Sequence, residues 1–140
     1  MGVINWLRAL GTAGLALPVG MLLFGWYRSL YRPGPYGRWL GAGLLLAALF
    51  GYYYAGPVRY PAAGTVAGLL VPPTFVVAFG LVNWLSERLN GRPFILPNRP
   101  TMTPAERTAL NASDLAGYAL LMLASYGMFF YWSVQIGQRP

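Results

Sequence analysis

The chain has 140 residues, of which 56% are hydrophobic and only 9% are charged. Soluble domains carry about 25% charged residues, so this composition indicates a membrane protein. The basic residues are all arginine, and histidine and cysteine are absent, which excludes disulfides, cysteine or histidine metal sites and lysine Schiff bases. The net charge of +7 fits anionic lipid headgroups better than nucleic acid, because the arginines lie beside apolar runs and no basic soluble domain remains.

Four long stretches without a charged side chain predict the fold class, an all-α, four-helix transmembrane bundle. A helix needs about 20 residues to cross the ~30 Å hydrocarbon core of a bilayer. The stretches are Ala9–Tyr27, Trp39–Val58, Tyr60–Ser86 and Leu115–Gln138. We therefore expect residues 1–140 to form one transmembrane domain, with spans of about 6–27, 39–55, 64–85 and 114–136 and cytoplasmic loops 28–38 and 86–113.

The first two spans are separated by a loop that carries a strong turn signal, Pro33-Gly34-Pro35. Pro18 lies inside the first span, where it can bend the helix. The second span leads into a short outer loop that contains Arg59. These features predict a helical hairpin whose polar turn lies at residues 28–38.

The third span contains Pro72-Pro73, and we expect this proline pair to kink the helix. Each proline removes an N–H donor, which leaves carbonyls near Gly68 and Leu69 without partners. One interpretation is a broken helix that lines a ligand or ion site. The other is a purely structural kink, in which Thr74 or a neighbouring helix supplies the missing donor, and we favour it because no charged group accompanies the prolines.

The fourth span is preceded by a clear helix start, Thr103-Pro104-Ala105-Glu106, which matches a capping box with proline at the first helical position. The helical pattern from there to Ile136 is longer than one bilayer crossing. We therefore expect a break near residues 111–114, with Ser113 as the cap of the spanning helix.

Arginines and aromatic residues predict the orientation of the bundle. Seven of the ten arginines fall at loops one and three, which places these loops in the cytoplasm and both termini outside, in the inner membrane of a bacterium. Tryptophan and tyrosine favour the membrane interfaces. The expected inner belt is Trp26, Tyr27, Trp39 and Trp84, and the expected outer belt is Trp6, Tyr52, Tyr53, Tyr54, Tyr60, Tyr131 and Trp132.

Several groups of residues are candidates for binding. The tyrosines Tyr52, Tyr53 and Tyr54 could stack on a quinone or another flat pigment, although such clusters are usually interfacial belts. Small residues at four-residue spacing allow helices to pack closely, within this chain or with a partner. The small pairs are Gly37/Gly41, Gly43/Ala47, Gly64/Gly68 and Ala112/Ala116. The arginines expected to contact lipid headgroups or a partner are Arg28, Arg32, Arg38, Arg88, Arg92 and Arg99.

The sequence offers no set of residues that we recognise as catalytic. The acids are Glu87, Glu106 and Asp114, and they form no carboxylate pair, nucleophile–base pair or acidic metal cluster. We therefore expect a protein that is not an enzyme and has no catalytic or metal site and no cofactor of its own. The leading hypothesis is an accessory subunit that packs beside other transmembrane subunits of an energy-transducing or photosynthetic complex and helps to hold a lipid, quinone or pigment. The alternative is a stand-alone carrier or lipid-handling protein with its site at Pro72-Pro73.

Overall fold

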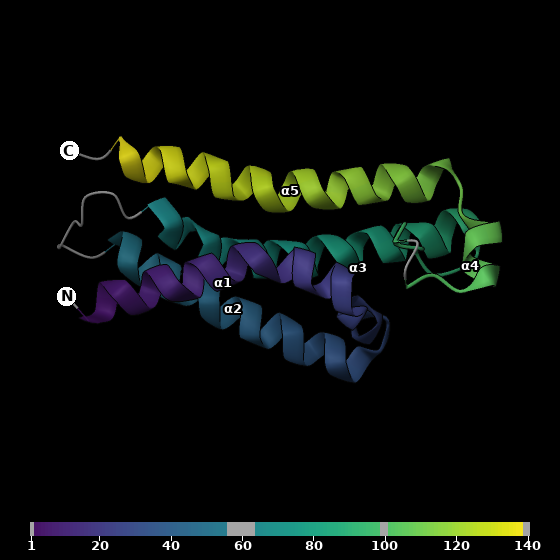
Figure 1. The fold of residues 1–140 in the computed structure, drawn as a ribbon, viewed down its shortest axis with the longest axis horizontal. Coiled ribbons are helices and arrows are strands. Elements are labelled where there is room, and N and C mark those ends of the chain that lie inside the picture. The colour runs from purple at the N-terminus through teal and green to yellow at the C-terminus, as the bar shows by residue number, and fades with distance from the viewer. Residues whose placement is uncertain (1, 56–63, 99–100, 139–140) are drawn as a thin grey trace.

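The computed structural model describes residues 2–55, 64–98 and 101–138, and all regular elements in these ranges are helices. Long helices lie side by side along the molecule, and short elements lie at both of its ends (Figure 1). The long elements are α1 (Gly2–Phe24), α2 (Pro33–Ala55), α3 (Val71–Asn90) and α5 (Ala112–Gly137). The short ones are the 3-10 helices η1 (Trp26–Tyr31) and η2 (Gly64–Leu70) and the helix α4 (Pro104–Ala109).

Within the described residues, three helical segments are long and apolar enough to cross a membrane: Asn5–Phe24, Val66–Asn90 and Ala112–Gly137. These segments support a multi-pass membrane protein, and the all-helical class is confirmed. Helix α2 is as long as α1, with 23 residues, but its glycines and tyrosines lower its hydropathy. A count of four spans therefore stays a prediction.

The turn signal after the first span is the start of a helix. Helix α2 begins at Pro33 rather than at Trp39, so proline and glycine here open a helix instead of forming a loop. Proline is tolerated in a first helical turn because the N–H that it lacks has no intrahelical partner there. Before it, α1 ends at Phe24, and Gly25 adopts a left-handed conformation with φ 69° that turns the chain into η1.

The proline pair of the third span lies in the first turn of α3, directly after η2. The Thr74 hydroxyl donates to the Leu70 carbonyl at 2.7 Å. The sequence predicted free carbonyls near Gly68 and Leu69, and the acceptor is the next residue, Leu70. The donor is Thr74, as predicted. The prolines therefore mark a change from 3-10 to α-helix, and the kink predicted there stays a prediction.

The capping box predicted before the fourth span is confirmed. The Thr103 hydroxyl accepts from the Glu106 N–H at 3.2 Å, and the Glu106 carboxylate accepts from the Thr103 N–H at 2.8 Å. Helix α4 then ends at Ala109, and α5 begins after a second capping box, in which Asn111 is the cap and Asp114 the third helical residue. The assignment of this cap to Ser113 is wrong.

Close backbone contacts hold the bundle together where α1 crosses η2. A Cβ atom on Gly68 would lie 2.0 Å from the Gly11 carbonyl oxygen, and one on Gly14 would lie 2.3 Å from the Gly68 carbonyl oxygen. Helix α2 meets α3 in the same way, since a Cβ on Gly43 would lie 2.9 Å from the Pro73 Cα. Small residues at these positions therefore serve packing within the chain.

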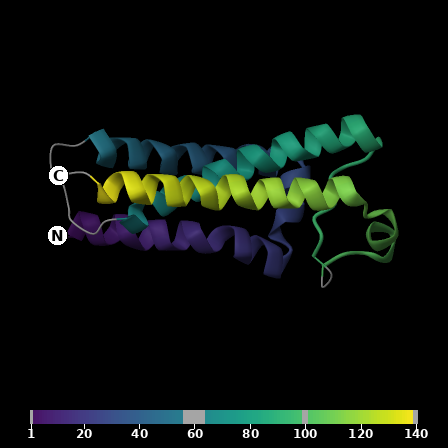
Figure 2. The ribbon, with the colours of Figure 1, turned by 90° about the horizontal axis from the view of Figure 1, so that it is seen from above.

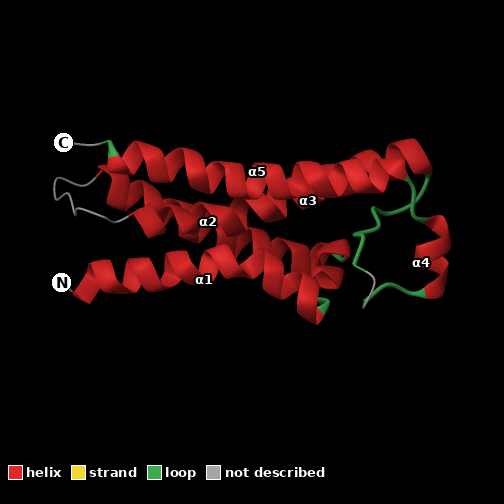
Figure 3. Ribbon diagram, turned by 45° about the horizontal axis from the view of Figure 1, so that its top comes forward, coloured by secondary structure: helices red, strands yellow, loops and turns green. Residues whose placement is uncertain are grey.

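The two chain ends lie at one end of the bundle, and η1, α4 and the described parts of the segment before α4, residues 91–98 and 101–103, lie at the other (Figures 1 and 3). Seen from above, α5 runs along the middle of the molecule (Figure 2). It packs on α3 toward α4 and on η2 toward the chain ends. We call the end opposite the termini, with residues 25–38, 86–98 and 101–114, the polar end.

Candidate functional site

A buried ion pair organises the polar end. The Asp114 side chain is fully buried, and its two carboxylate oxygens accept from the Arg92 guanidinium at 2.7 and 3.2 Å. The same oxygens also accept from the backbone N–H groups of Ile95 and Asn111, both at 3.1 Å. A buried charge is tolerated when it is paired and hydrogen-bonded in this way. These bonds fasten the segment 91–103 to the start of α5.

Arg92 also holds the end of α4. Its Nη2 atom donates to the Ala109 carbonyl at 2.7 Å. Hydrogen bonding to Asp114 raises the pKa of Arg92, against the lowering effect of burial. Arg92 therefore stays charged and joins three parts of the polar end: the segment 91–103, α4 and α5.

A second ion pair joins η1 to α4. The Arg28 guanidinium donates to both carboxylate oxygens of Glu106 at 3.0 Å, and it also donates to the Thr101 carbonyl. This pair is more open than the first, with 39% of the Arg28 side chain and 26% of the Glu106 side chain exposed. The bonds to Arg28 lower the pKa of Glu106, against burial.

Two tyrosines of η1, Tyr27 and Tyr31, form hydrogen bonds close to Arg28. Tyr27 is only 2% exposed, and its hydroxyl lies 2.9 Å from that of Thr101. The Tyr31 hydroxyl donates to the Phe94 carbonyl, and burial raises the pKa of Tyr31 well above its usual value. The Tyr27 side chain is therefore part of the core, and its place in an inner aromatic belt stays a prediction.

The two arginines line a cavity of about 330 Å³, which we call the polar-end cavity. It is also lined by Glu106, Tyr31 and the stretch Arg92–Ile95. Two guanidinium groups and one carboxylate therefore face the same space.

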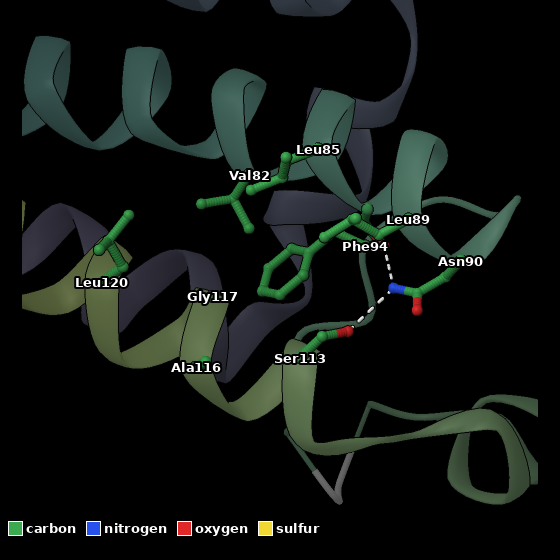
Figure 4. A pocket seen from close by; sticks show the side chains of 10 residues that line it. Val82, Leu85, Leu89, Asn90, Phe94, Ser113, Ala116, Gly117 and Leu120 are labelled. Carbon is green, nitrogen blue, oxygen red and sulfur yellow. Dashed lines mark hydrogen bonds between the residues drawn. The ribbon is translucent and has the colours of Figure 1, made fainter.

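An apolar groove of about 230 Å³ lies next to this cavity, between α3 and α5 (Figure 4). Phe94 points into it from the segment 91–103 and lines both the groove and the polar-end cavity. At one end the Asn90 amide donates to the hydroxyls of Ser86 and Ser113 at 3.2 and 2.9 Å. The other lining residues are Val82, Leu85, Leu89, Ala116, Gly117 and Leu120. The groove is thus apolar along its length and polar at its mouth.

The structure distributes the predicted binding residues over different places. Tyr52 is 81% exposed, whereas the Tyr54 ring packs against Phe50 and Trp132 with centroid distances of 5.8 and 5.1 Å. Tyr53 packs against the same apolar cluster near the chain ends. The three tyrosines therefore do not form one stacking surface.

The proline pair lies away from the polar end. Pro72 and Pro73 are buried, and Pro72 lines a cavity of about 170 Å³ between α1 and α2. Gly14, Trp39 and Gly43 line it as well, and no charged side chain does.

The arginines expected at headgroups fall into two sets. Arg28 and Arg92 pair with acids, as described above. Arg32 and Arg38 are exposed, and Arg88 is exposed with its guanidinium 5.2 Å from the centre of the Trp84 ring. Arg99 lies outside the described residues, as does the outer loop with Arg59.

Sequence reasoning missed the role of Asp114 and Phe94. A signal for Asp114 exists: Asn111 followed three residues later by an acid repeats the pattern of Thr103 and Glu106. No local pattern shows that Arg92 reaches Asp114 or that Phe94 fills the space between α3 and α5, because both contacts depend on how the segment 91–103 folds back.

Comparison with known proteins gives one partial similarity. No protein family matches the chain, and no solved structure matches it significantly. A curated relative is the mitochondrial protoheme IX farnesyltransferase of the yeast Debaryomyces hansenii, which is 28% identical over 116 residues. The match covers 81% of this chain and 24% of that protein, so the chain spans about a quarter of the length of the relative that it matches.

This similarity contradicts the expectation that the chain is not an enzyme. The protein that shares these residues is named a transferase, which is a catalytic function. The expectation relied on the absence of familiar catalytic groups, and that absence alone does not exclude a catalytic role.

Proposed function

We propose that this chain is a membrane-embedded lipid-handling protein whose α3–α5 groove holds the hydrocarbon chain of a prenyl lipid. The observation that carries the proposal is the groove itself, apolar along its length and polar at the mouth beside Asn90 and Ser113. The name of the partial relative, a farnesyltransferase, supports a branched isoprenoid as the chain.

The size of the groove supports a bound chain segment rather than an enclosed ligand. Pockets that enclose a drug-sized molecule have volumes of about 300 to 1,000 Å³, and this groove has about 230 Å³. It is lined by residues on two of the candidate spans. A lipid can therefore enter it sideways from the bilayer and leave the rest of its chain among other lipids.

The test is the retention of labelled farnesol by the protein reconstituted in nanodiscs, with an unbranched alcohol of similar length as the reference. Ala116→Phe fills the groove from an exposed position on α5, and Ala119→Phe adds the same ring at an exposed position that does not line it. We expect only Ala116→Phe to lose farnesol. Equal retention by both variants, or no preference for farnesol over the unbranched alcohol, would contradict the proposal.

Catalysis on the lipid is measured in the same samples. A farnesyl donor and protoheme IX are added, and transfer is followed by chromatography. We include this assay because the relative is named for that transfer.

A second candidate function is that of a subunit in a larger membrane complex. Small residues follow one exposed face of α2 at alternating spacings of three and four residues, interrupted once by Leu44. They are Gly34, Gly37, Gly41, Ala48, Gly51 and Ala55. No atom lies within 4 Å of a Cβ built on any of the four glycines, so another helix could approach closely.

This second function is tested by native electrophoresis after gentle solubilisation. Gly41→Leu should release a co-migrating subunit, whereas Ala119→Leu on α5 should not. If both variants and the parent chain migrate as the same small species, the chain works without such a partner.

A further inference from the structure

We propose that the polar-end cavity binds a phosphate group, and that this phosphate takes the place of Glu106 on Arg28. The phosphate is carried by an amphiphilic lipid or is free in solution, and the experiment below separates these two sources. The inference rests on the proposed function only in that the groove would hold the chain of the same lipid.

The bilayer itself is the first reason to look for a polar anchor. Lipid tails are as apolar as the leucines of the groove, so a chain that leaves the bilayer gains only from its fit to the shape of the groove. A polar contact with the head of the lipid adds affinity to that fit. Phe94 lines both the groove and the polar-end cavity, so a head and a chain of one molecule have adjacent places.

Arg28 already has the geometry that a phosphate needs. Both of its terminal nitrogens donate to the two oxygens of one anion at 3.0 Å, and phosphate offers the same pair of acceptors as a carboxylate. The Arg28 side chain is 39% exposed, so a ligand can reach it from the cavity. Arg92 brings a second guanidinium to the same cavity, while its partner Asp114 is fully buried behind it.

Glu106 is held weakly enough to be displaced. It belongs to α4, a helix of six residues with no buried side chain. Its ion pair is half open, and such pairs contribute little to stability. When a phosphate replaces it, the Glu106 carboxylate turns toward water, while the Glu106 backbone N–H still donates to the Thr103 hydroxyl.

Charge at this end also favours an incoming anion. Residues 28–38 and 86–114 carry seven arginines and three acids in the sequence, which leaves a net charge of +4. A phosphate is therefore attracted to this end even though Arg28 and Arg92 are each paired.

The experiment compares lipids that differ only in phosphate. Native mass spectrometry measures how much phosphatidic acid, and how much diacylglycerol with the same chains, the detergent-solubilised protein retains. The variant Glu106→Gln removes the competing anion, so we expect it to retain about two- to fivefold more phosphatidic acid. Arg28→Gln removes the two guanidinium donors, and we expect it to retain about tenfold less phosphatidic acid.

Controls use residues of the same end that do not line the cavity. Glu87→Gln and Arg38→Gln remove one acid and one arginine from exposed positions, and both should leave retention within about twofold of the parent. Arg28→Lys keeps the positive charge but loses the paired guanidinium donors, so it should bind phosphatidic acid more weakly than the parent.

Opposite effects of Glu106→Gln and Arg28→Gln are the result that supports the proposal. A merely structural ion pair would make both variants lose stability and lipid together, and that result would overturn it. A thermal shift with inorganic phosphate that depends on Arg28, without retention of phosphatidic acid, would assign the site to free phosphate. Retained farnesol with no phosphate effect would overturn this inference alone, whereas loss of farnesol binding in the parent chain bears only on the proposed function.

Discussion

At the scale of single residues, Asp114 is the side chain on which the polar end depends. A fully buried carboxylate is stable only because Arg92 and two backbone N–H groups compensate its charge. The contacts with Arg92 and Ile95 join residues 22 and 19 positions apart in the chain. One acid therefore connects the segment 91–103 with the first turn of α5.

Replacing Asp114 by asparagine should destabilise the protein by about 3 to 5 kcal/mol, because the Arg92 guanidinium then lies half-buried without its counter-charge. The measurement is the unfolding midpoint in mixed detergent micelles. Glu87→Gln is the matched control, since Glu87 is exposed, and it should change the free energy of unfolding by less than about 0.5 kcal/mol. Similar midpoints for the two variants would show that the buried pair contributes nothing.

The pair of Arg28 and Glu106 predicts a dependence on pH. The pKa of Glu106 in the folded protein lies below its usual value of 4.5, so its stabilising contribution is present above about pH 4.5 and is lost as pH falls through the lowered pKa. Because the pair is partly exposed, the loss should be at most about 1 kcal/mol. Thermal unfolding from pH 7 to pH 3 measures it as the difference between the parent chain and Glu106→Gln. A difference that stays constant over this range would refute the assignment.

At the scale of elements, glycines decide how closely the helices approach. The crossing of α1 and η2 leaves no space for a methyl group at Gly14 or Gly68, whereas nothing lies within 4 Å of a Cβ at Gly20 in the same α1. Glycine is usually unfavourable inside a helix, so its presence at the crossing reflects contact between backbones.

Gly14→Ala should therefore destabilise the bundle by about 1 to 3 kcal/mol or more, because the methyl group meets backbone atoms that can move only together with the helix. Gly20→Ala should be neutral or stabilise by up to about 1 kcal/mol, because alanine favours the helix and meets no atom. Circular dichroism during thermal unfolding in detergent compares the two. A tolerated Gly14→Ala would contradict the close crossing.

Prolines at the same scale show why element boundaries are hard to predict. Pro33-Gly34-Pro35 reads as a turn, and Pro72-Pro73 reads as a break inside a span, yet both occupy the first turn of a helix. A proline at that position and a proline in a turn have the same φ, so the local sequence does not distinguish them. The choice depends on whether the following residues pack, as Pro73 does against Gly43.

At the scale of the whole molecule, both termini lie at one end of the bundle and the polar end lies at the other (Figure 1). Seven of the ten arginines fall at residues 28–38 and 86–113 of the sequence. We propose that this end faces the cytoplasm, because arginine-rich loops of membrane proteins are retained there.

Topology reporters test this orientation. A reporter inserted at Pro97 should read cytoplasmic, and one fused after the last residue should read exterior. Reporters at the two chain ends should agree with each other, because both ends lie at the same end of the bundle (Figure 3). Opposite readings for the two termini would mean an odd number of crossings and would contradict the four-span prediction.

The sequence by itself determined the class of this protein. Long uncharged runs and a low content of charged residues are sufficient for an all-helical membrane protein, because an unpaired backbone polar group is too costly in lipid. The capping box at Thr103 and Glu106 was equally readable, since all its bonds are local. Bulk hydrophobicity and short-range hydrogen bonds act on the chain whatever its final fold.

Only the tertiary structure decided where the polar end has its charges and which helices touch. Arg28 meets Glu106 across 78 positions, and Tyr27 meets Thr101 across 74, so neither contact leaves a periodic trace in the sequence. The same holds for the groove, whose walls come from α3 and α5 and whose inner side chain, Phe94, comes from the segment between them. Side chains far apart in the sequence meet only when the helices have packed. Close packing of the helices, and not separation along the chain, then sets the distance between them.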